Sequence, residues 1–296
     1  MIVKSELDNN MSKSFTKSGS TIPTIGLGTW DLNGNDCLRV VTEALDIGYR
    51  HIDGAAMYEN ESKVGAGIIN SCVERDDIFL ATKINTIGWT PSGGNNGVIK
   101  NKDITITFEK SLKDLKTDYV DLLLIHWPMF ETNLGDMLEI MYKIKESRKA
   151  KEIGVANFNR ALLDESIALG FSDIYCNQFE YHPFLSQTKL LNEVQKQDMI
   201  PVAYCPICRG DVAKDDVILD LADKYSKTPA QVALRWVIQQ NVVAIPKTAS
   251  SSRLKENFDI YNFSIDDKDM DKIFGLARNQ RLVPNLESNA DLYPWD

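Results

Sequence analysis

Four side chains of the types that catalyse proton transfer occur in the first half of the chain. They are Asp53, Tyr58, Lys83 and His126. A tyrosine phenol titrates at about pH 10 in water, and a buried ammonium group beside it favours the phenolate and so lowers its pKa. A buried ammonium needs a counter-charge, which Asp53 can supply, and an imidazole can hydrogen-bond a carbonyl oxygen. Together these groups describe a general acid beside a polarised carbonyl.

Each of these residues lies at or just after the end of a segment with strand-like composition. Eight such segments occur, at residues 24–28, 49–53, 78–83, 119–126, 152–157, 174–180, 201–205 and 242–246. Several are continuously apolar, which is typical of strands buried on both faces of a parallel sheet. Helical periodicities lie between them, and Thr228-Pro229 is typical of a helix start.

Eight alternations of strand and helix within 296 residues favour a single closed (β/α)8 barrel. The competing arrangement is an open doubly wound sheet, whose usual Gly-x-Gly-x-x-Gly fingerprint is missing from the sequence. We expect the barrel to span residues 18–296 and residues 1–17 to form a flexible extension. In such a barrel the residues at the carboxyl ends of the strands line the active site.

Polar side chains also end the later strands. Asn157 ends the fifth, Gln178 and Tyr204 lie near the ends of the sixth and seventh, and Lys247 follows the eighth. Taken singly, each has an ordinary structural explanation, since a lysine at a strand end is usually a solvated charge and an amide often satisfies loop backbone. Their convergence on one rim favours a functional site, and that convergence depends on the fold.

Composition limits the partners and the location that we expect. The net charge of −9 disfavours binding to a nucleic-acid backbone. No apolar run approaches the roughly 20 residues that span a bilayer, and the first residues contain no apolar signal region. We therefore expect a cytoplasmic protein with neither a nucleic-acid nor a membrane partner. No heptad repeat or apolar stripe predicts an obligate assembly, so we expect a monomer.

The order of these motifs resembles the aldo-keto reductase family over roughly residues 22–296. The runs GLGTW at 26–30 and GYRHIDGAAMYENE at 48–61 resemble the family's signature. Similar matches are DYVDLLLIHWP at 118–128, IGVANF at 153–158, NQFEYHP at 177–183, and IPKT at 245–248 with Arg253, Glu256 and Asn257. The tail at 281–296 is similar to the tails of bacterial 2,5-diketo-D-gluconate reductase and methylglyoxal reductase-like members.

The resemblance implies a role for each site residue. Tyr58 would donate a proton to the carbonyl oxygen, and His126 would orient the carbonyl. Lys83, paired with Asp53, would lower the pKa of Tyr58. The implied cofactor contacts are Asn157 and Gln178 at the nicotinamide carboxamide, Tyr204 on the ring, Lys247, Thr248 and Arg253 at the adenosine 2′-phosphate, and Asn257 near the adenine. Two cations and a hydroxyl at the phosphate favour NADPH over NADH.

The resemblance also implies a pocket for a small carbonyl substrate. Trp30 and Trp127 would form its apolar walls, and the tail at 281–296 would fold across the mouth. Three features depart from the family pattern. Ala156 replaces a frequent serine that bonds the carboxamide, Cys205-Pro206-Ile207-Cys208 replaces a more usual Ser-Pro-Leu run, and the loop at 86–102 is longer than in the short bacterial members.

Three other interpretations stay open. The barrel could bind a nicotinamide nucleotide without physiological catalysis, as a redox-sensing or structural subunit. Lys83 could be the nucleophile of a Schiff-base lyase, although the neighbouring Asp53 and Tyr58 fit a reductase better. Cys205 and Cys208 have the spacing of a redox or zinc pair, but a structural zinc needs four ligands. The chain has three histidines, none near this pair in sequence, and no second C-x-x-C, so we expect no metal.

Overall fold

The computed structural model describes residues 13–88, 90–92, 99–128 and 133–283. Eight parallel strands form one sheet in the order β10-β9-β8-β7-β6-β5-β4-β3, so each strand pairs with its neighbours in sequence. The strands are β3 (Leu27–Gly28), β4 (His51–Asp53), β5 (Phe79–Ile84), β6 (Val120–Ile125), β7 (Ala150–Ala156), β8 (Cys176–Glu180), β9 (Ile200–Tyr204) and β10 (Val243–Ala244). All eight expected strands are therefore present, with bounds that differ by a few residues.

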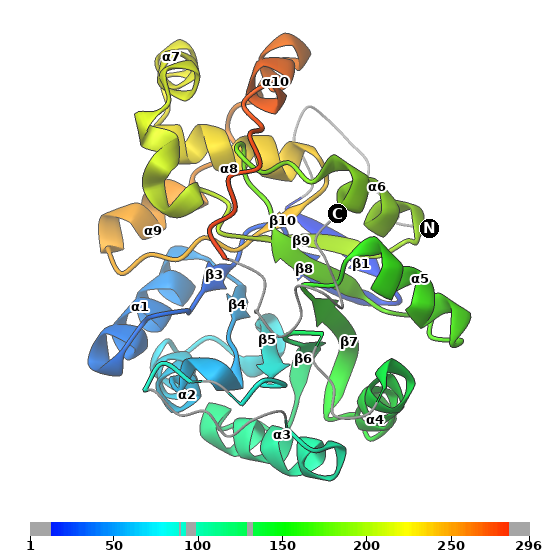
Figure 1. Cartoon of the computed structure of the whole chain (residues 1–296). Helices are drawn as coiled ribbons and strands as arrows, with labels where there is room; N and C mark the ends of the chain where they lie inside the picture. The colour runs from blue at the N-terminus through cyan, green and yellow to red at the C-terminus, as the bar shows by residue number, and fades with distance from the viewer. Residues whose placement is uncertain (1–12, 89, 93–98, 129–132, 284–296) are drawn as a thin grey trace.

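The sheet closes on itself between its first and last strands. Gly26 N donates to Ala244 O at 2.9 Å, Ala244 N donates to Thr24 O at 2.9 Å, and Ile25 forms a parallel bridge with Ala244. A closed ring of strands leaves no free edge. The predicted (β/α)8 barrel is therefore confirmed (Figure 1).

Helices surround the barrel (Figure 1). Those that connect successive strands are α1 (Gly34–Ile47), α2 (Glu61–Asn70), α3 (Asn101–Leu115), α4 (Leu134–Glu146), α5 (Arg160–Ala168), α6 (Thr188–Lys196), and α7 (Asp216–Tyr225) with α8 (Pro229–Gln239). The helices α9 (Ser251–Phe258) and α10 (Asp267–Phe274) follow the last strand. Thr228 and Gln231 form a capping box ahead of α8, with Pro229 in the first turn, as the sequence predicts. No helix within the described ranges is long and apolar enough to cross a membrane.

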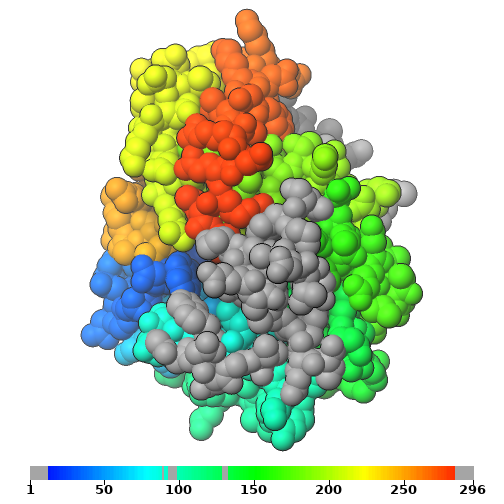
Figure 2. Space-filling view, in the orientation of Figure 1, coloured from blue at the N-terminus to red at the C-terminus, as the bar shows by residue number. Residues whose placement is uncertain are grey.

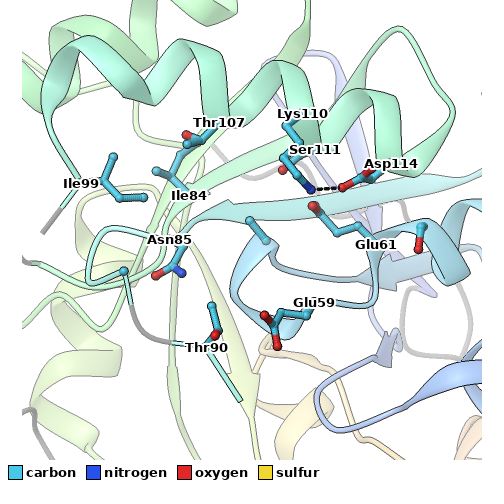
Figure 3. A pocket seen from close by; sticks show the side chains of 13 residues that line it. Glu59, Glu61, Ile84, Asn85, Thr90, Ile99, Thr107, Lys110, Ser111 and Asp114 are labelled. Atoms are coloured by element: carbon cyan, nitrogen blue, oxygen red, sulfur yellow. Dashed lines mark hydrogen bonds and ion pairs between the residues drawn. The ribbon is translucent and has the colours of Figure 1, made fainter. Parts of the chain in front are cut away.

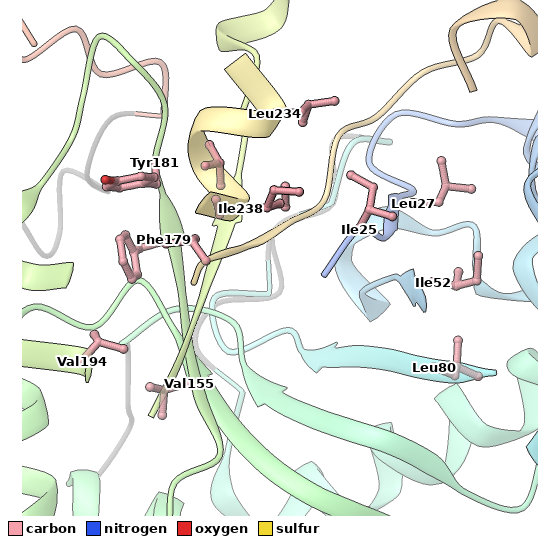
Figure 4. Packing of buried hydrophobic residues seen from close by; sticks show 14 of the residues in the cluster. Ile25, Leu27, Ile52, Leu80, Val155, Phe179, Tyr181, Val194, Leu234 and Ile238 are labelled. Atoms are coloured by element: carbon pink, nitrogen blue, oxygen red, sulfur yellow. The ribbon is translucent and has the colours of Figure 1, made fainter. Parts of the chain in front are cut away.

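The strands separate two apolar cores. Side chains such as Ile52, Leu80 and Val155 point outward and pack against the helices (Figure 4). A second cluster, which includes Leu122, Leu124 and Val202, fills the inside of the barrel. Because side chains alternate along a strand, the same strand supplies both cores. The barrel interior is therefore packed, and the functional groups are confined to its ends.

An amino-terminal hairpin joins the inner core. Its strands are β1 (Ser14–Lys17) and β2 (Ser20–Pro23), and Phe15 and Ile22 belong to the cluster inside the barrel. Lys17 Nζ also donates to Ile174 O at 2.8 Å. The expected boundary between residues 17 and 18 is therefore wrong, because it divides this hairpin. Phe15 and Ile22 face the core, but the polar residues 16–21 between them made the segment look like an extension. Residues 1–12, residues 284–296 of the expected tail at 281–296 and parts of the 86–102 loop lie outside the described residues.

Closure of the barrel depends on one close approach of two backbones. Gly28 N donates to Pro246 O at 3.1 Å, and a Cβ on Gly28 would lie 2.8 Å from Ile245 O. We expect Gly28→Ala to lower the free energy of unfolding by about 1–3 kcal/mol through overpacking. Urea unfolding followed by circular dichroism measures this loss. The control is Gly54→Ala, whose Cβ would be 3.5 Å from its nearest neighbour, and equal losses in both variants would contradict the closure argument.

Candidate active site

The four predicted catalytic side chains meet at the carboxyl ends of three neighbouring strands. Asp53 ends β4 and Lys83 belongs to β5, while His126 directly follows β6. Tyr58 ends a short 3-10 turn, η1 (Ala56–Tyr58), after β4. The Tyr58 ring lies 5.6 Å from the His126 ring, centroid to centroid, and 5.3 Å from Lys83 Nζ. The structure therefore brings together the residues that the sequence separates by up to 73 positions.

A buried ion pair lies at the centre of this group. Lys83 Nζ is 2.5 Å from Asp53 Oδ1 and donates to Gly54 O at 2.8 Å. The second carboxylate oxygen of Asp53 accepts from Gln178 Nε2 at 2.8 Å. Burial works to lower the pKa of Lys83, but the charge of Asp53 and the neighbouring Tyr58 outweigh it, so the pKa is raised. Lys83 therefore stays an ammonium at neutral pH.

The direction of the Tyr58 pKa shift differs from the expectation. Burial raises the pKa of its phenol, while the charge of Lys83 and its hydrogen bond lower it, and the net pKa lies above the ordinary value. The expected shift toward neutrality is therefore wrong for this structure, because the sequence indicated the neighbouring cation but not the extent of burial. The phenol keeps its proton at neutral pH, and Lys83 is the neighbouring group that favours its release.

His126 is a neutral imidazole in this environment. Burial, followed by the charge of Lys83, holds its pKa well below the ordinary value. Its Nδ1 is buried and has no hydrogen-bond partner among the described residues. A neutral imidazole carries one donor and one acceptor nitrogen, so the ring can hydrogen-bond a polar group in either sense.

Apolar side chains surround the Tyr58 phenol. The Trp30 ring packs edge-on against it at 5.0 Å, and Trp127 belongs to a small cluster with Met57 and Ile87 that contacts Tyr58 and Val283. Both predicted pocket walls therefore lie beside Tyr58. Val283 brings the carboxyl-terminal segment to the same place, a contact that the sequence indicated only as a tail across the mouth.

The residues expected at the nicotinamide lie next to the ion pair. Asn157 Nδ2 donates to His126 O at 2.9 Å, and its Oδ1 accepts from the Tyr204 hydroxyl at 2.8 Å. Gln178 is bonded to Asp53, as described above. Ala156 is fully buried and presents only a methyl group. Polar amides and an aromatic ring at one rim match a flat heteroaromatic amide, although the Asn157 amide is already engaged within the protein.

The residues expected at the adenosine phosphate lie between β10 and the start of α9. Thr248 Oγ1 accepts from Ser250 N at 3.1 Å, Arg253 is exposed in the first turn of α9, and Asn257 is buried. Lys247 Nζ lies 3.7 Å from Asp31 Oδ2, a pairing that the sequence analysis missed. A helix amino terminus with two cations fits an anionic group, and Asp31 shares one of these cations.

A cavity of about 540 Å³ lies beside the site, outside the barrel wall (Figure 3). Its lining includes Glu61 from α2 and Ser111 from α3, and none of the four catalytic candidates. The Thr82 hydroxyl donates to Glu61 Oε1 at 2.6 Å. Burial raises the pKa of the Glu61 carboxyl group. Because Thr82 points away from the barrel axis while Lys83 points inward, Glu61 braces the strand that carries Lys83.

Comparison with known proteins identifies the family. Residues 24–278 match the model of the Aldo/keto reductase family. The chain belongs to this family of oxidoreductases. The predicted resemblance is thereby confirmed.

Curated relatives cover nearly the whole chain. The chain is 37% identical over 269 residues to the glyoxal reductase of Bacillus subtilis (strain 168), covering 90% of this chain and 94% of the relative. It is 34% identical over 276 residues to the methylglyoxal reductase DkgA of Escherichia coli (strain K12), covering 91% and 94%.

Solved structures agree with these relatives. An aldo/keto reductase from Brucella melitensis superposes with a TM-score of 0.81 at 36% identity, covering 90% of this chain and 98% of the other. The aldose reductase from Schistosoma japonicum gives 0.82 at 28% identity, covering 92% and 93%.

The buried ion pair of Lys83 and Asp53 leads us to expect a specific effect on stability. Lys83→Met leaves the Asp53 carboxylate buried without its cation, so we expect a loss of about 3–5 kcal/mol in the free energy of unfolding. The double variant Lys83→Met/Asp53→Asn removes both charges and should recover most of that loss. Urea unfolding of the two single variants and the double variant measures the coupling. Additive losses would show that the two charges do not stabilise each other.

The lowered pKa of His126 leads us to expect a specific dependence on pH. Because burial holds its pKa well below the ordinary value, His126 should show no ring titration from pH 8 to pH 5. The same holds for His51, whose pKa burial lowers to about 4. Each unfolded histidine binds a proton below about pH 6.5, so both residues reduce the free energy of unfolding as the pH falls from there toward the folded pKa. NMR of ¹³C-labelled histidine rings measures these titrations, and a His126 midpoint near 6.5 would refute the assignment.

Proposed function

We propose that the chain is an NADPH-dependent reductase that converts aldehydes or ketones to alcohols, with Tyr58 as the general acid. The observation that carries the proposal is the meeting of three side chains at one rim: the Tyr58 ring lies 5.3 Å from Lys83 Nζ and 5.6 Å from the His126 ring, and Lys83 is paired with Asp53. The names of the relatives support carbonyl compounds as the substrate class.

Each of the four side chains has a distinct task. His126 would hydrogen-bond the carbonyl oxygen and hold it near the phenol. Tyr58 would transfer its proton to that oxygen as negative charge develops there, leaving a phenolate. Lys83 would stabilise the phenolate, and Asp53 keeps Lys83 charged through their 2.5 Å contact. A nicotinamide dinucleotide, when bound, supplies the hydride to the carbonyl carbon.

The cofactor would be held at two places on the rim. Asn157, Gln178 and Tyr204 would orient the nicotinamide. Lys247, Thr248 and Arg253 would bind the 2′-phosphate, with Asn257 near the adenine. Two cations at an exposed helix start support NADPH over NADH. Monomeric state and cytoplasmic location stay predictions from the sequence.

The alternative chemistries find less support. A Schiff-base nucleophile must be a neutral amine, whereas Asp53 raises the pKa of Lys83 against the effect of burial. Burial raises the pKa of Cys205 to about 11 and that of Cys208 to about 12, so both are poorly reactive thiols at neutral pH. A barrel that binds the nucleotide without catalysis would have the same site, so only a measurement of turnover distinguishes it from the proposed reductase.

Tyr58→Phe tests the proposed acid. We expect the turnover of methylglyoxal or 4-nitrobenzaldehyde to fall by about 10²–10⁴-fold, because the proton donor is removed while the ring remains. The loss of NADPH absorbance measures turnover. The dissociation constant of NADPH, followed by protein fluorescence, should stay within about twofold of the wild type. Normal turnover in this variant would refute the role of Tyr58, and tight NADPH binding by the wild type without turnover would favour the non-catalytic barrel.

Lys247→Met tests the cofactor preference. We expect the dissociation constant of NADPH to rise by about tenfold or more, because a charge-assisted contact to the 2′-phosphate is lost, while NADH binding is unchanged. Asp31→Asn should act in the opposite direction and tighten NADPH by a few-fold, roughly the strength of an exposed ion pair. Calorimetric titration with both nucleotides measures the change. Equal effects on NADPH and NADH would place Lys247 away from the 2′-phosphate.

A further inference from the structure

We propose that Glu180 is a positioning residue for the carbonyl substrate, because its buried carboxylate holds the carboxyl-terminal segment 281–283 so that Val283 completes the apolar wall around Tyr58. The proposal rests on the proposed function, since it assumes that the substrate binds at Tyr58. Among the residues that the structure describes, the partners of the Glu180 carboxylate are His182, Leu282 and Val283, and none of them is one of the four proposed catalytic side chains.

The carboxylate of Glu180 is bound on both oxygens. It ends β8 and is completely buried. Leu282 N donates to its Oε1 at 2.7 Å, and Val283 N donates to its Oε2 at 2.9 Å. His182 Nε2 lies 2.9 Å from Oε1. Two successive backbone N–H groups on two oxygens determine the orientation of both the carboxylate and the segment.

Further bonds hold the same segment along the loop after β8. Gln187 Nε2 donates to the backbone oxygen of Glu180 at 2.5 Å, and Arg281 Nη2 donates to Gln187 Oε1 at 3.1 Å. Upstream, the backbone N–H groups of Arg278 and Gln280 both donate to Phe184 O at 3.1 Å. The chain after α10 therefore runs from the edge of the barrel toward its centre (Figure 1), and its red surface lies between the yellow and green elements in Figure 2.

The anchored segment reaches the proposed substrate pocket at Val283. This side chain packs against the cluster of Met57, Ile87 and Trp127 that also contacts Tyr58. Burying a carboxylate is costly unless its hydrogen bonds are satisfied, and here the bonds that satisfy it come from the segment that forms the pocket wall. The pocket wall and the barrel strand are therefore coupled through one side chain.

Glu180→Gln is a nearly isosteric test of this anchor. An amide can accept only one of the two N–H bonds and places its own N–H₂ against the other donor. We expect the KM for methylglyoxal to rise about tenfold while kcat and the dissociation constant of NADPH change by less than about threefold. We also expect trypsin to cleave after Arg281 about tenfold faster, because the segment detaches more often.

Two further variants complete the experiment. Leu282→Pro removes one N–H donor without changing Glu180, so it should reproduce the rise in KM, and the double variant should add little. Trypsin cleavage is measured in Glu180→Gln alone, because trypsin does not cleave before a proline. Leu282→Pro also keeps the test valid where Glu180→Gln does not fold. Glu139→Gln makes the same chemical change on an exposed side chain of α4 and should change nothing.

Several outcomes would overturn the proposal. One is an unchanged KM in Glu180→Gln and Leu282→Pro. Another is a weakened NADPH affinity at constant KM, which would mean that Glu180 acts on the cofactor side, where Tyr204 is its register partner on β9. Unchanged trypsin cleavage in Glu180→Gln would refute the anchor itself. Because cleavage does not require catalysis, faster cleavage in a protein without NADPH-dependent turnover would refute the proposed function and the substrate role while retaining the anchor.

Discussion

The buried pair of Lys83 and Asp53 is the interaction on which the site depends. Neither charge is tolerable alone inside a barrel, because desolvation disfavours an unpaired ion. The two residues come from adjacent strands, and Gln178 from across the rim binds the second oxygen of Asp53. The pair therefore links three strand ends, and Tyr58 and His126 both lie close enough to this cation to feel its charge.

Burial, rather than the cation alone, decides the protonation states around that pair. It raises the pKa of Tyr58 against the effect of Lys83, and it lowers the pKa of His126 in the same direction as Lys83. The result at neutral pH is a protonated phenol, a charged lysine and a neutral imidazole. In the proposed reaction, this combination would let the site donate a proton to a carbonyl oxygen without a permanent positive charge on His126.

A second buried carboxylate at the same rim, that of Glu180, binds the carboxyl-terminal segment. Loops and tails build the walls of sites on (β/α)8 barrels, and a tail needs an attachment point if its side chains are to shape a pocket. Glu180 supplies that point at the end of β8, where its carboxylate is completely buried. Val283 then lies beside Tyr58 because of a bond made several residues away from the chemistry.

The sequence by itself determined the eight-stranded barrel, the family and the candidate tetrad, because apolar runs, turn residues and short motifs are local features that need no knowledge of distant contacts. It misplaced the amino-terminal boundary and the direction of the Tyr58 pKa shift, and it did not show the pairing of Asp31 with Lys247 or the anchoring by Glu180. Only the tertiary structure decided these points, since each depends on burial or on atoms from segments distant in the chain.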